Sequence, residues 1–366
     1  MKYIDEFRNP ALARTLLARI KARSTRPTRL MEFCGGHTHA ILRYGLRELL
    51  PSTIDLRSGP GCPVCVTANA DLDRAIALAE VPGVILTTFG DMIRVPGSSR
   101  SLQDAKAEGA DVRMVYSTLD ALQIARDNPQ RPVVFLGVGF ETTAPTVAAA
   151  ILQAQAEGLE NFSVLSLHKL TPPATRAILD AGDVALQGII GPGHVTTIIG
   201  ADAWGFLPAE YGVPVAVAGF EPLDILRAVA DLVDMVEEGR PAVSNVYARS
   251  VAPQGNLAAL EVMDRVFEVS AADWRGLGVV PASGLRIRPA FASFDAALRF
   301  EVDPGPTREH KGCRCGDVLR GTILPPQCPL FGRVCTPARP IGPCMVSAEG
   351  ACAAYYRFRK AETGAV

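Results

Sequence analysis

Short apolar runs alternate with alanine-rich amphipathic stretches from about residue 29 to residue 219. Six runs have the length and composition of buried strands: residues 84–89, 112–116, 133–138, 163–168, 186–190 and 214–219. The stretches between them predict helices over residues 68–79, 144–156 and 173–181, and residues 10–22 predict an earlier helix. Strands that alternate with helices are typical of parallel sheets covered on both faces, so we expect an α/β fold.

The pattern changes in the last third of the chain. Further helices are predicted over residues 223–238, 256–267 and 347–359, with Ser347 as the N-cap of the last one. Residues 304–343 are dominated by glycine, proline and cysteine. Such a segment is too poor in apolar side chains to build a core, so we expect a metal or disulfides to hold it together.

Polar and glycine-rich loops follow several predicted strands. They include Asp91, Glu141 with Thr142, and His194. The carboxyl ends of parallel strands meet at one edge of a sheet, where ligands bind, so these residues are candidates for a site. Helix capping is the alternative for each loop taken alone; the recurrence of the pattern at five strand ends favours function.

Six of the nine cysteines lie within 40 residues, at positions 313, 315, 328, 335, 344 and 352. Clustered thiolates bind soft metals, either zinc or iron–sulfur clusters. The usual C-x2-4-C zinc knuckle is absent from this stretch, and the wide spacing suits a 4Fe-4S cluster with four cysteine ligands. Zinc and inert thiols are the alternatives. A cluster would leave two cysteines for a redox dithiol, but the spacing does not say which two.

The other three cysteines lie in two glycine-rich motifs. Cys62 and Cys65 form a C-x-x-C pair at a predicted helix start, where we expect a lowered thiol pKa and either redox chemistry or metal binding. Cys34 is followed by two glycines and by His37 and His39, which are potential metal ligands or proton carriers. A buried cysteine before a glycine turn is the alternative. An unpaired thiol beside His37 suits the attachment of a transferable metal.

Composition narrows the possible functions. The chain has 366 residues and a formal charge of −1, which predicts two or three domains and argues against nucleic-acid binding. The charged start and the lack of a 20-residue apolar run predict a cytoplasmic protein without a membrane span. Nine cysteines in a reducing compartment favour metal or redox chemistry. No phosphate loop, complete G-x-G-x-x-G, G-x-S-x-G or C-x3-C-x2-C motif occurs.

Together these motifs resemble the HypD family of hydrogenase maturation factors. The resemblance is carried by residues 34–39 (CGGHTH), 59–65 (GPGCPVC), 88–92, 139–145 and 191–194, and by the six-cysteine tail. It implies assembly of the Fe(CN)2CO unit of NiFe hydrogenases, together with a small HypC-type chaperone and a HypE-type cyanide donor. It also implies two α/β domains facing a cleft and an iron–sulfur domain; we expect these over residues 1–118, 119–245 and 246–366.

The resemblance also suggests roles for individual residues. Cys34 would hold the iron that receives cyanide and carbon monoxide, with a cysteine of the chaperone as co-ligand. The 4Fe-4S ligands would be Cys313, Cys328, Cys335 and Cys352, and Cys315 with Cys344 would be the dithiol, as in the similar tail of ferredoxin–thioredoxin reductase. Electrons would pass from the cluster through both dithiols to the iron. The chain would then be a scaffold with redox activity; the alternatives are a stand-alone thiol–disulfide oxidoreductase and a zinc-stabilised interaction protein.

Overall fold

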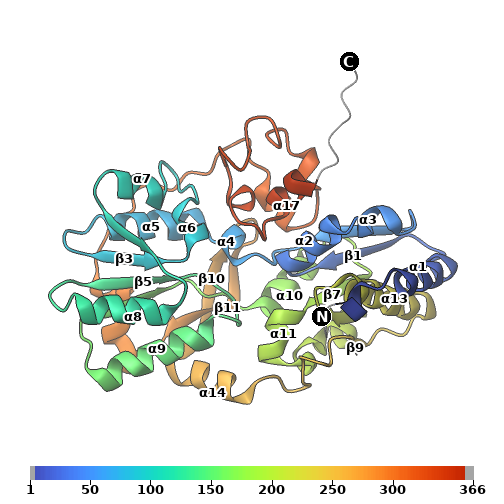
Figure 1. The fold of residues 1–366 in the computed structure, drawn as a ribbon, viewed down its shortest axis with the longest axis horizontal. Helices are drawn as coiled ribbons and strands as arrows, with labels where there is room; N and C mark the ends of the chain where they lie inside the picture. Colours follow the sequence, from blue (N-terminus) through green and yellow to red (C-terminus); the bar gives the residue numbers. More distant parts are fainter. Residues whose placement is uncertain (1–4, 359–366) are drawn as a thin grey trace.

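Two parallel β-sheets with helices on their faces make up most of the protein. The structure is a computed structural model that describes residues 5–358. Figure 1 shows the two sheets side by side, with the cysteine-rich tail above the region where they meet. The expected α/β class with two parallel sheets and a cysteine-rich C-terminal region is confirmed.

The first sheet has the strand order β2-β1-β7-β8-β9. Its strands are β1 (Thr28–Glu32), β2 (Ile54–Ser58), β7 (Gly188–Pro192), β8 (Val215–Ala218) and β9 (Val243–Asn245). All neighbours are parallel, and Leu30 of β1 lies opposite both Leu56 and Gly188. The helices that follow these strands or pack beside them are α1 (Pro10–Arg23), α2 (Gly35–Arg43), α3 (Leu46–Leu49), α4 (Pro63–Val66), α10 (Thr171–Ala181), α11 (Gly193–Ile199), α12 (Phe206–Tyr211) and α13 (Pro222–Glu238).

The second sheet has the order β4-β3-β5-β6 and is also fully parallel. Its strands are β3 (Ile85–Thr88), β4 (Asp111–Met114), β5 (Val133–Gly137) and β6 (Phe162–Ser166). Its helices are α5 (Asn69–Ala79), α6 (Gly90–Ile93), α7 (Leu102–Ala107), α8 (Thr118–Asp127) and α9 (Ala144–Glu157). Every predicted strand and helix of this region is present, with small shifts at the ends.

The chain order of the strands does not follow the predicted division at residue 118. The chain leaves the first sheet after β2, builds all four strands of the second sheet, and returns to the first sheet with β7. Each sheet therefore contains strands from both sides of residue 118. The folding domains themselves stay a prediction, but the sheets cross this limit because parallel pairing depends on complementary apolar faces and not on closeness in the chain.

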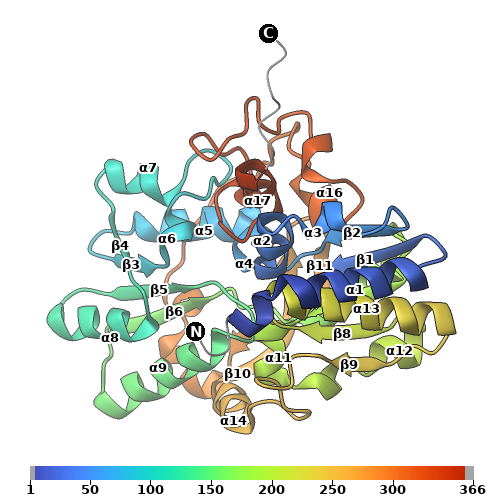
Figure 2. The ribbon, with the colours of Figure 1, turned by 45° about the vertical axis from the view of Figure 1, so that its right-hand side comes forward.

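An antiparallel hairpin, absent from the sequence-based expectations, lies between the two sheets. Strand β10 (Phe267–Trp274) pairs with β11 (Gly278–Ile287), directly after α14 (Leu257–Val266). Isolated bridges join Trp274 to Thr67 beside α4 and Gly284 to Lys169 after β6. Both views show β10 and β11 in the middle of the molecule (Figures 1 and 2). The hairpin thus connects the C-x-x-C region with the second sheet.

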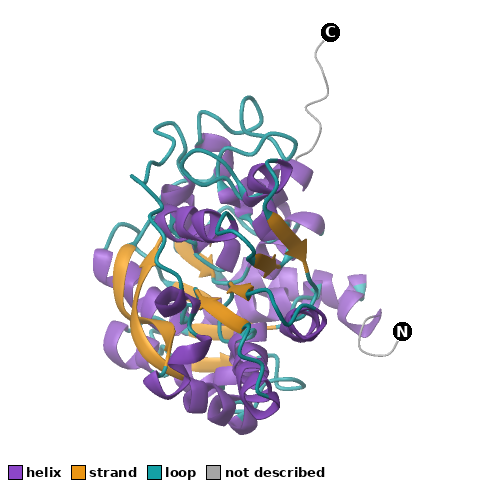
Figure 3. Cartoon of the chain, turned by 90° about the vertical axis from the view of Figure 1, so that its left-hand side faces the viewer, coloured by secondary structure: helices purple, strands orange, loops and turns teal. Residues whose placement is uncertain are grey.

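The cysteine-rich tail is mostly irregular, as Figure 3 shows by the teal loops at the top of the molecule. Its short helices are α15 (Ala296–Arg299), α16 (Cys315–Leu319) and α17 (Ala351–Phe358). The predicted N-cap of the last helix is wrong: α17 begins at Ala351, and the Ser347 hydroxyl bonds Asp91 instead. Residue 359 of that prediction lies outside the described residues. No helix within residues 5–358 combines the length and apolarity needed to cross a bilayer.

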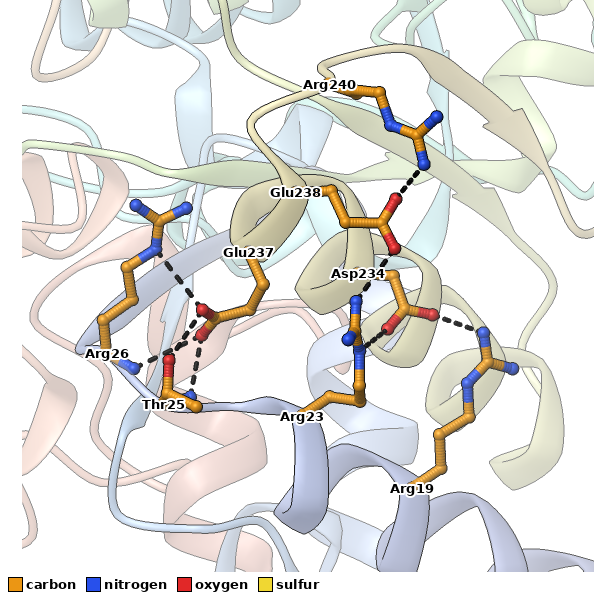
Figure 4. A network of polar contacts seen from close by, with 8 residues as sticks. All are labelled: Arg19, Arg23, Thr25, Arg26, Asp234, Glu237, Glu238 and Arg240. Atoms are coloured by element: carbon orange, nitrogen blue, oxygen red, sulfur yellow. Dashed lines mark hydrogen bonds and ion pairs between the residues drawn. The ribbon is translucent and has the colours of Figure 1, made fainter.

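A network of ion pairs fastens α1 to α13 at the outer face of the first sheet (Figure 4). The Asp234 carboxylate accepts hydrogen bonds from Arg19 and, at 2.9 Å, from Arg23. Glu237 accepts bonds from the Thr25 amide and hydroxyl, each at 2.7 Å. These side chains are partly exposed to solvent, which screens them, so the network orients the helices more than it stabilises the fold.

Candidate functional site

The candidate residues follow the carboxyl ends of parallel strands, as predicted. Cys34 follows β1, Cys62 follows β2, Asp91 follows β3, Glu141 follows β5, and His194 follows β7. Parallel pairing brings the ends of neighbouring strands to one edge of each sheet. The topology therefore gathers motifs that are up to 160 residues apart in the chain.

The Cys34 loop and the C-x-x-C loop pack backbone against backbone. Gly61 lies directly against Phe33 and Cys34, and a Cβ atom at Gly61 would come within 2.5 Å of the Cys34 Cα. The Gly35 amide donates a hydrogen bond to the Gly61 carbonyl at 3.2 Å. Glycine is therefore required at position 61 of the motif at 59–65, because only a residue without a side chain lets the two loops approach this closely.

Cys34 is a buried thiol at the start of α2. Burial raises its pKa to about 12, nearby carboxylates of Glu349 and Glu32 add to the rise, and the amides of Gly36 and His37 oppose it. Glu32 accepts a hydrogen bond from the Cys34 amide at 3.1 Å, and burial raises the pKa of Glu32 to about 8. The free thiol therefore stays protonated at neutral pH, and a bound metal would have to displace its proton.

His37 is buried and held in one orientation. Its Nε2 lies 3.2 Å from the Ala218 carbonyl and 3.0 Å from the Gly219 carbonyl, so Nε2 carries the proton and donates it. Its Nδ1 has no hydrogen-bond partner among the residues that the structure describes. Burial lowers the pKa of His37 to about 4, so the ring is neutral. Such a neutral ring has a free lone pair that could accept a proton or a ligand.

Phe220 links the two predicted histidines. Its ring stacks on His37 with centroids 4.7 Å apart and on His194 with centroids 3.9 Å apart. Phe220 also lies against Gly36, next to Cys34. His194 itself is exposed, so the stack leads from the buried Cys34 loop to the surface. His39 points elsewhere and packs edge-on against Phe358 of the tail.

The C-x-x-C pair lies against Cys344 of the tail. The Cys65 amide donates to the Cys62 sulfur at 3.2 Å, and the Cys65 side chain is fully buried. Burial raises the pKa of Cys65 well above its usual value, and interaction with the Cys344 thiol partly opposes the rise. The expected lowering of the pKa is therefore wrong for Cys65, because loss of solvent outweighs the dipole of a helix that is only one turn long.

All six tail cysteines line one small cavity, whose other walls are mostly apolar. The Cys315 and Cys344 sulfurs lie 2.9 Å apart. The Cys335 sulfur accepts a hydrogen bond from the Ile341 amide at 3.3 Å, and Cys313 is partly exposed. Within residues 5–358, no three His, Cys, Asp or Glu side chains gather closely enough to hold a single metal ion. Four thiolates around a cavity are the donor set that an iron–sulfur cube takes.

The remaining predicted residues are spread more widely. The half-buried Asp91 accepts a hydrogen bond from Ser347 at 2.7 Å, which joins α6 to the tail. Glu141 is buried and accepts bonds from the amide and hydroxyl of Thr171 at 2.7 and 3.2 Å, so it caps α10; burial raises its pKa to about 7. Thr142 is exposed. Among the described residues, neither Glu141 nor Thr142 forms a hydrogen bond with a cysteine.

Three residues near Cys34 escaped the sequence reasoning. They are Glu32, Phe220 and Glu349; the last packs its main chain against Gly35. Phe220 follows a strand and could have been found by the same argument as His194. Glu349 gives no such signal, because only the path of the tail brings it to α2.

Comparisons with known proteins agree over the whole chain. A family model described as “HypD: Hydrogenase formation hypA family” matches residues 11–359. The chain is 54% identical to “Hydrogenase maturation factor HypD” of Azotobacter vinelandii, over 98% of this chain and 97% of that protein. It is 53% identical to “Hydrogenase expression/formation protein HupD” of Azotobacter chroococcum mcd 1, over 100% of this chain and 99% of that protein. It is 44% identical to the HypD protein of Escherichia coli K12 over the full length of both.

Proposed function

The chain belongs to the HypD family of hydrogenase maturation factors, and from this premise we propose that it assembles the Fe(CN)2CO unit of NiFe hydrogenases on Cys34. The observation that carries this proposal is the continuity of the sulfur groups. Cys315 and Cys344 are in contact at 2.9 Å inside the cysteine-lined cavity, and Cys344 also interacts with Cys65 of the C-x-x-C pair. The C-x-x-C loop in turn packs on Cys34 through Gly61.

A 4Fe-4S cluster fits the residues that are present. Cys313, Cys328, Cys335 and Cys352 would hold it, and all four line the cysteine cavity. The two cysteines left over, Cys315 and Cys344, are the pair whose sulfurs touch, which supports this division of the six. When bound, the cluster would supply electrons one at a time. The Ile341 amide that bonds the Cys335 sulfur would favour the charged, ligating form of this thiol.

Cys34 is proposed as the attachment point of the iron that is being modified. The iron, with its cyanide and carbon monoxide ligands, is here a substrate that must later leave. A soft thiolate binds such iron well, while one protein thiol with a co-ligand from a HypC-type chaperone leaves the attachment reversible. Iron binding must displace the proton of this buried thiol. The Nδ1 of His37 has no hydrogen-bond partner among the described residues, and burial lowers the pKa of His37 to about 4, so the ring is proposed to act near the iron as a neutral ligand or hydrogen-bond acceptor and not as the base that takes the thiol proton.

Cyanide release is the step that needs reducing equivalents. A thiocyanate group on a HypE-type donor takes up two electrons and one proton and yields a thiol and cyanide. A dithiol delivers two electrons and two protons as its disulfide forms, so one dithiol matches one cyanide. We assign this role to Cys62 and Cys65, with Cys344 placed to regenerate them by thiol–disulfide exchange.

Infrared spectroscopy of the anaerobically purified complex with the chaperone tests the proposal. We expect cyanide and carbonyl stretches of bound iron in the wild type, and no cyanide stretch in Cys328→Ser, which would lack the cluster that supplies the electrons. Cys34→Ala should remove both bands while the brown iron–sulfur absorption near 400 nm persists. Bands that survive in Cys34→Ala would refute the attachment site, and normal cyanide transfer in Cys62→Ala would remove the C-x-x-C pair from the route.

A further inference from the structure

The loops around the cysteine cavity form a positively charged surface on an otherwise acidic protein. Residues 304–343 contain six Lys or Arg and two Asp or Glu, a net charge of +4, whereas the whole chain carries −1. The rest of the chain therefore carries −5. Five of the six basic side chains are exposed and form what we name the basic rim: Arg308, Lys311, Arg314, Arg333 and Arg339.

Most of the basic rim is not neutralised by the protein. Arg314 pairs with Asp317, which also pairs with Arg320. The side chains of Arg308, Lys311, Arg333 and Arg339, in contrast, make no ion pair with any residue in the described part of the chain. Exposed and unpaired positive charges produce a long-range field that attracts acidic partners.

The basic rim borders the cysteine cavity, since Arg314 lines the cavity and Arg308 lines a groove beside it. A groove beside the tail is lined by Arg94, Arg275 and Arg308, and its wall includes Cys313, Cys315 and Gly342. The same three wall residues line the cysteine cavity, so the groove and the cavity share a wall. Lys311 and Arg333 each stand two residues before a cysteine of that cavity. Arg275 is buried and bound to Asn69 and Glu309, which makes this part of the groove rigid.

We propose that the basic rim and the adjoining groove are the docking site of a small acidic one-electron carrier protein of the ferredoxin class. The proposal rests on the proposed function, because the dithiols must be reduced again after each release of cyanide, and the electrons for this must come from outside the chain. In each docking event the carrier's reduced centre loses one electron and the resident cluster gains one; no bond forms or breaks. Two such events would supply the two electrons that reduce one disulfide, whose S–S bond breaks while its two sulfurs take up two protons and become thiols.

Charge complementarity favours a carrier protein over a purely internal role for these side chains. A charge that only balanced the cluster would act best when buried beside it, as Arg275 does, because solvent and salt screen an exposed charge within about 10 Å. The basic rim points outward instead. Complementary surfaces of this kind mainly accelerate association and orient the partner.

Binding of a purified acidic [2Fe-2S] ferredoxin to the full-length protein tests the docking site. We expect the double variant Arg308→Glu/Arg339→Glu to weaken the affinity at least tenfold at low ionic strength, with the difference shrinking as salt is added. Arg14→Glu/Lys21→Glu on the exposed side of α1 makes the same change in net charge and serves as the matched control; it should stay within about twofold of the wild type. Equal effects of both double variants, or an unchanged affinity in the first, would overturn the proposal.

A second readout separates this proposal from the proposed function. The iron and sulfide content of the protein, and the reduction of its cluster by dithionite, can be measured without a carrier protein. Both measurements should be unchanged in the Arg308→Glu/Arg339→Glu variant. The reduction of its cluster by ferredoxin should be slower than in the wild type. If the rim variant loses its cluster or fails to fold, Arg308→Gln/Arg339→Gln replaces it, with a smaller expected loss of affinity. If ferredoxin reduced the cluster of that variant at the wild-type rate, docking at the basic rim would be refuted, even if Cys34 is confirmed as the iron site.

Discussion

Replacing Gly61 by alanine tests whether the packing of two loops sets the geometry of the site. The added Cβ would overlap the Phe33 carbonyl carbon and the Cys34 amide, and would lie 2.5 Å from the Cys34 Cα. An ordinary contact begins near 3.4 Å, and the shortest of these approaches is 2.3 Å, to the Cys34 amide nitrogen, so the loops must separate by roughly 1.1 Å. All three neighbours are backbone atoms, which cannot rotate away as a side chain can.

The expected cost is at the upper end of the range for overpacking, about 3 kcal/mol of unfolding free energy. It includes the hydrogen bond between the Gly35 amide and the Gly61 carbonyl, which the separation weakens. Urea unfolding can be followed through Trp204 and Trp274, since both are buried in the apolar cluster that contains Cys62 and Cys65. Because displacements near 1 Å strongly impair positioned groups, iron loading on Cys34 should fall about tenfold or more.

Gly205→Ala is the matched control for this change. Gly205 has helical dihedral angles (φ −57°, ψ −24°), and a Cβ there would meet only the Asp202 carbonyl oxygen at 3.2 Å. This variant should unfold within about 1 kcal/mol of the wild type and load iron normally. If Gly61→Ala matched it in both measurements, the packing of the two motifs would not control the site.

Three further predictions concern the tail, a buried carboxyl and the helix network. Cys344→Ser should keep the iron and sulfide content but lose cyanide transfer, whereas Cys328→Ser should lose most iron and sulfide; elemental analysis and the transfer assay check this pair. Glu141→Gln should remove a pH dependence of the unfolding free energy. The pKa of Glu141 is about 7 in the folded protein and 4.5 in the unfolded chain. Its ionisation therefore lowers the stability of the wild type by about 3 kcal/mol as the pH rises from 4.5 to about 7. Asp234→Asn should cost less than about 1 kcal/mol in urea unfolding, because the ion pairs it breaks are partly exposed.

Opposite results would identify the faulty step in each case. Equal loss of iron in both cysteine variants would mean that Cys344 is a cluster ligand. A Glu141→Gln variant with the same pH profile as the wild type would show that this carboxyl is not the group whose pKa is raised. A cost above 2 kcal/mol for Asp234→Asn would mean that the network between α1 and α13 is far less screened than its exposure indicates.

Regular structure followed from the sequence wherever apolar periodicity was strong. The second sheet is buried on both faces, so β3, β5 and β6 are almost continuously buried and rich enough in apolar residues for the pattern to detect them. The hairpin β10–β11 escaped detection, because β11 contains a proline and two glycines and its buried and exposed positions do not alternate regularly. Its pairing is stabilised by tertiary contacts such as the Trp274–Ser283 hydrogen bond at 2.8 Å, which local propensity does not express.

The types of chemistry were also readable from the chain. The sequence indicated a protein with metal and redox chemistry. It contains nine cysteines, two glycine-rich motifs and a tail too poor in apolar residues to build a core. The pKa of Cys65 was not predictable, because it depends on complete burial and not on the position of the residue before a helix. Ser347 likewise matches a helix N-cap by sequence, but the fold directs its hydroxyl to Asp91, 256 residues away.

By itself, the sequence determined the α/β class, the strand ends that carry the candidate residues and the supply of thiols, because these depend on local periodicity and composition. Only the tertiary structure decided which sheet each strand joins, which sulfurs touch and what surrounds Cys34. The contact between Cys315 and Cys344 joins residues 29 apart within an irregular tail, and spacing along a chain does not specify distance in space. Those distances arise from the packing of whole elements, which no single segment encodes.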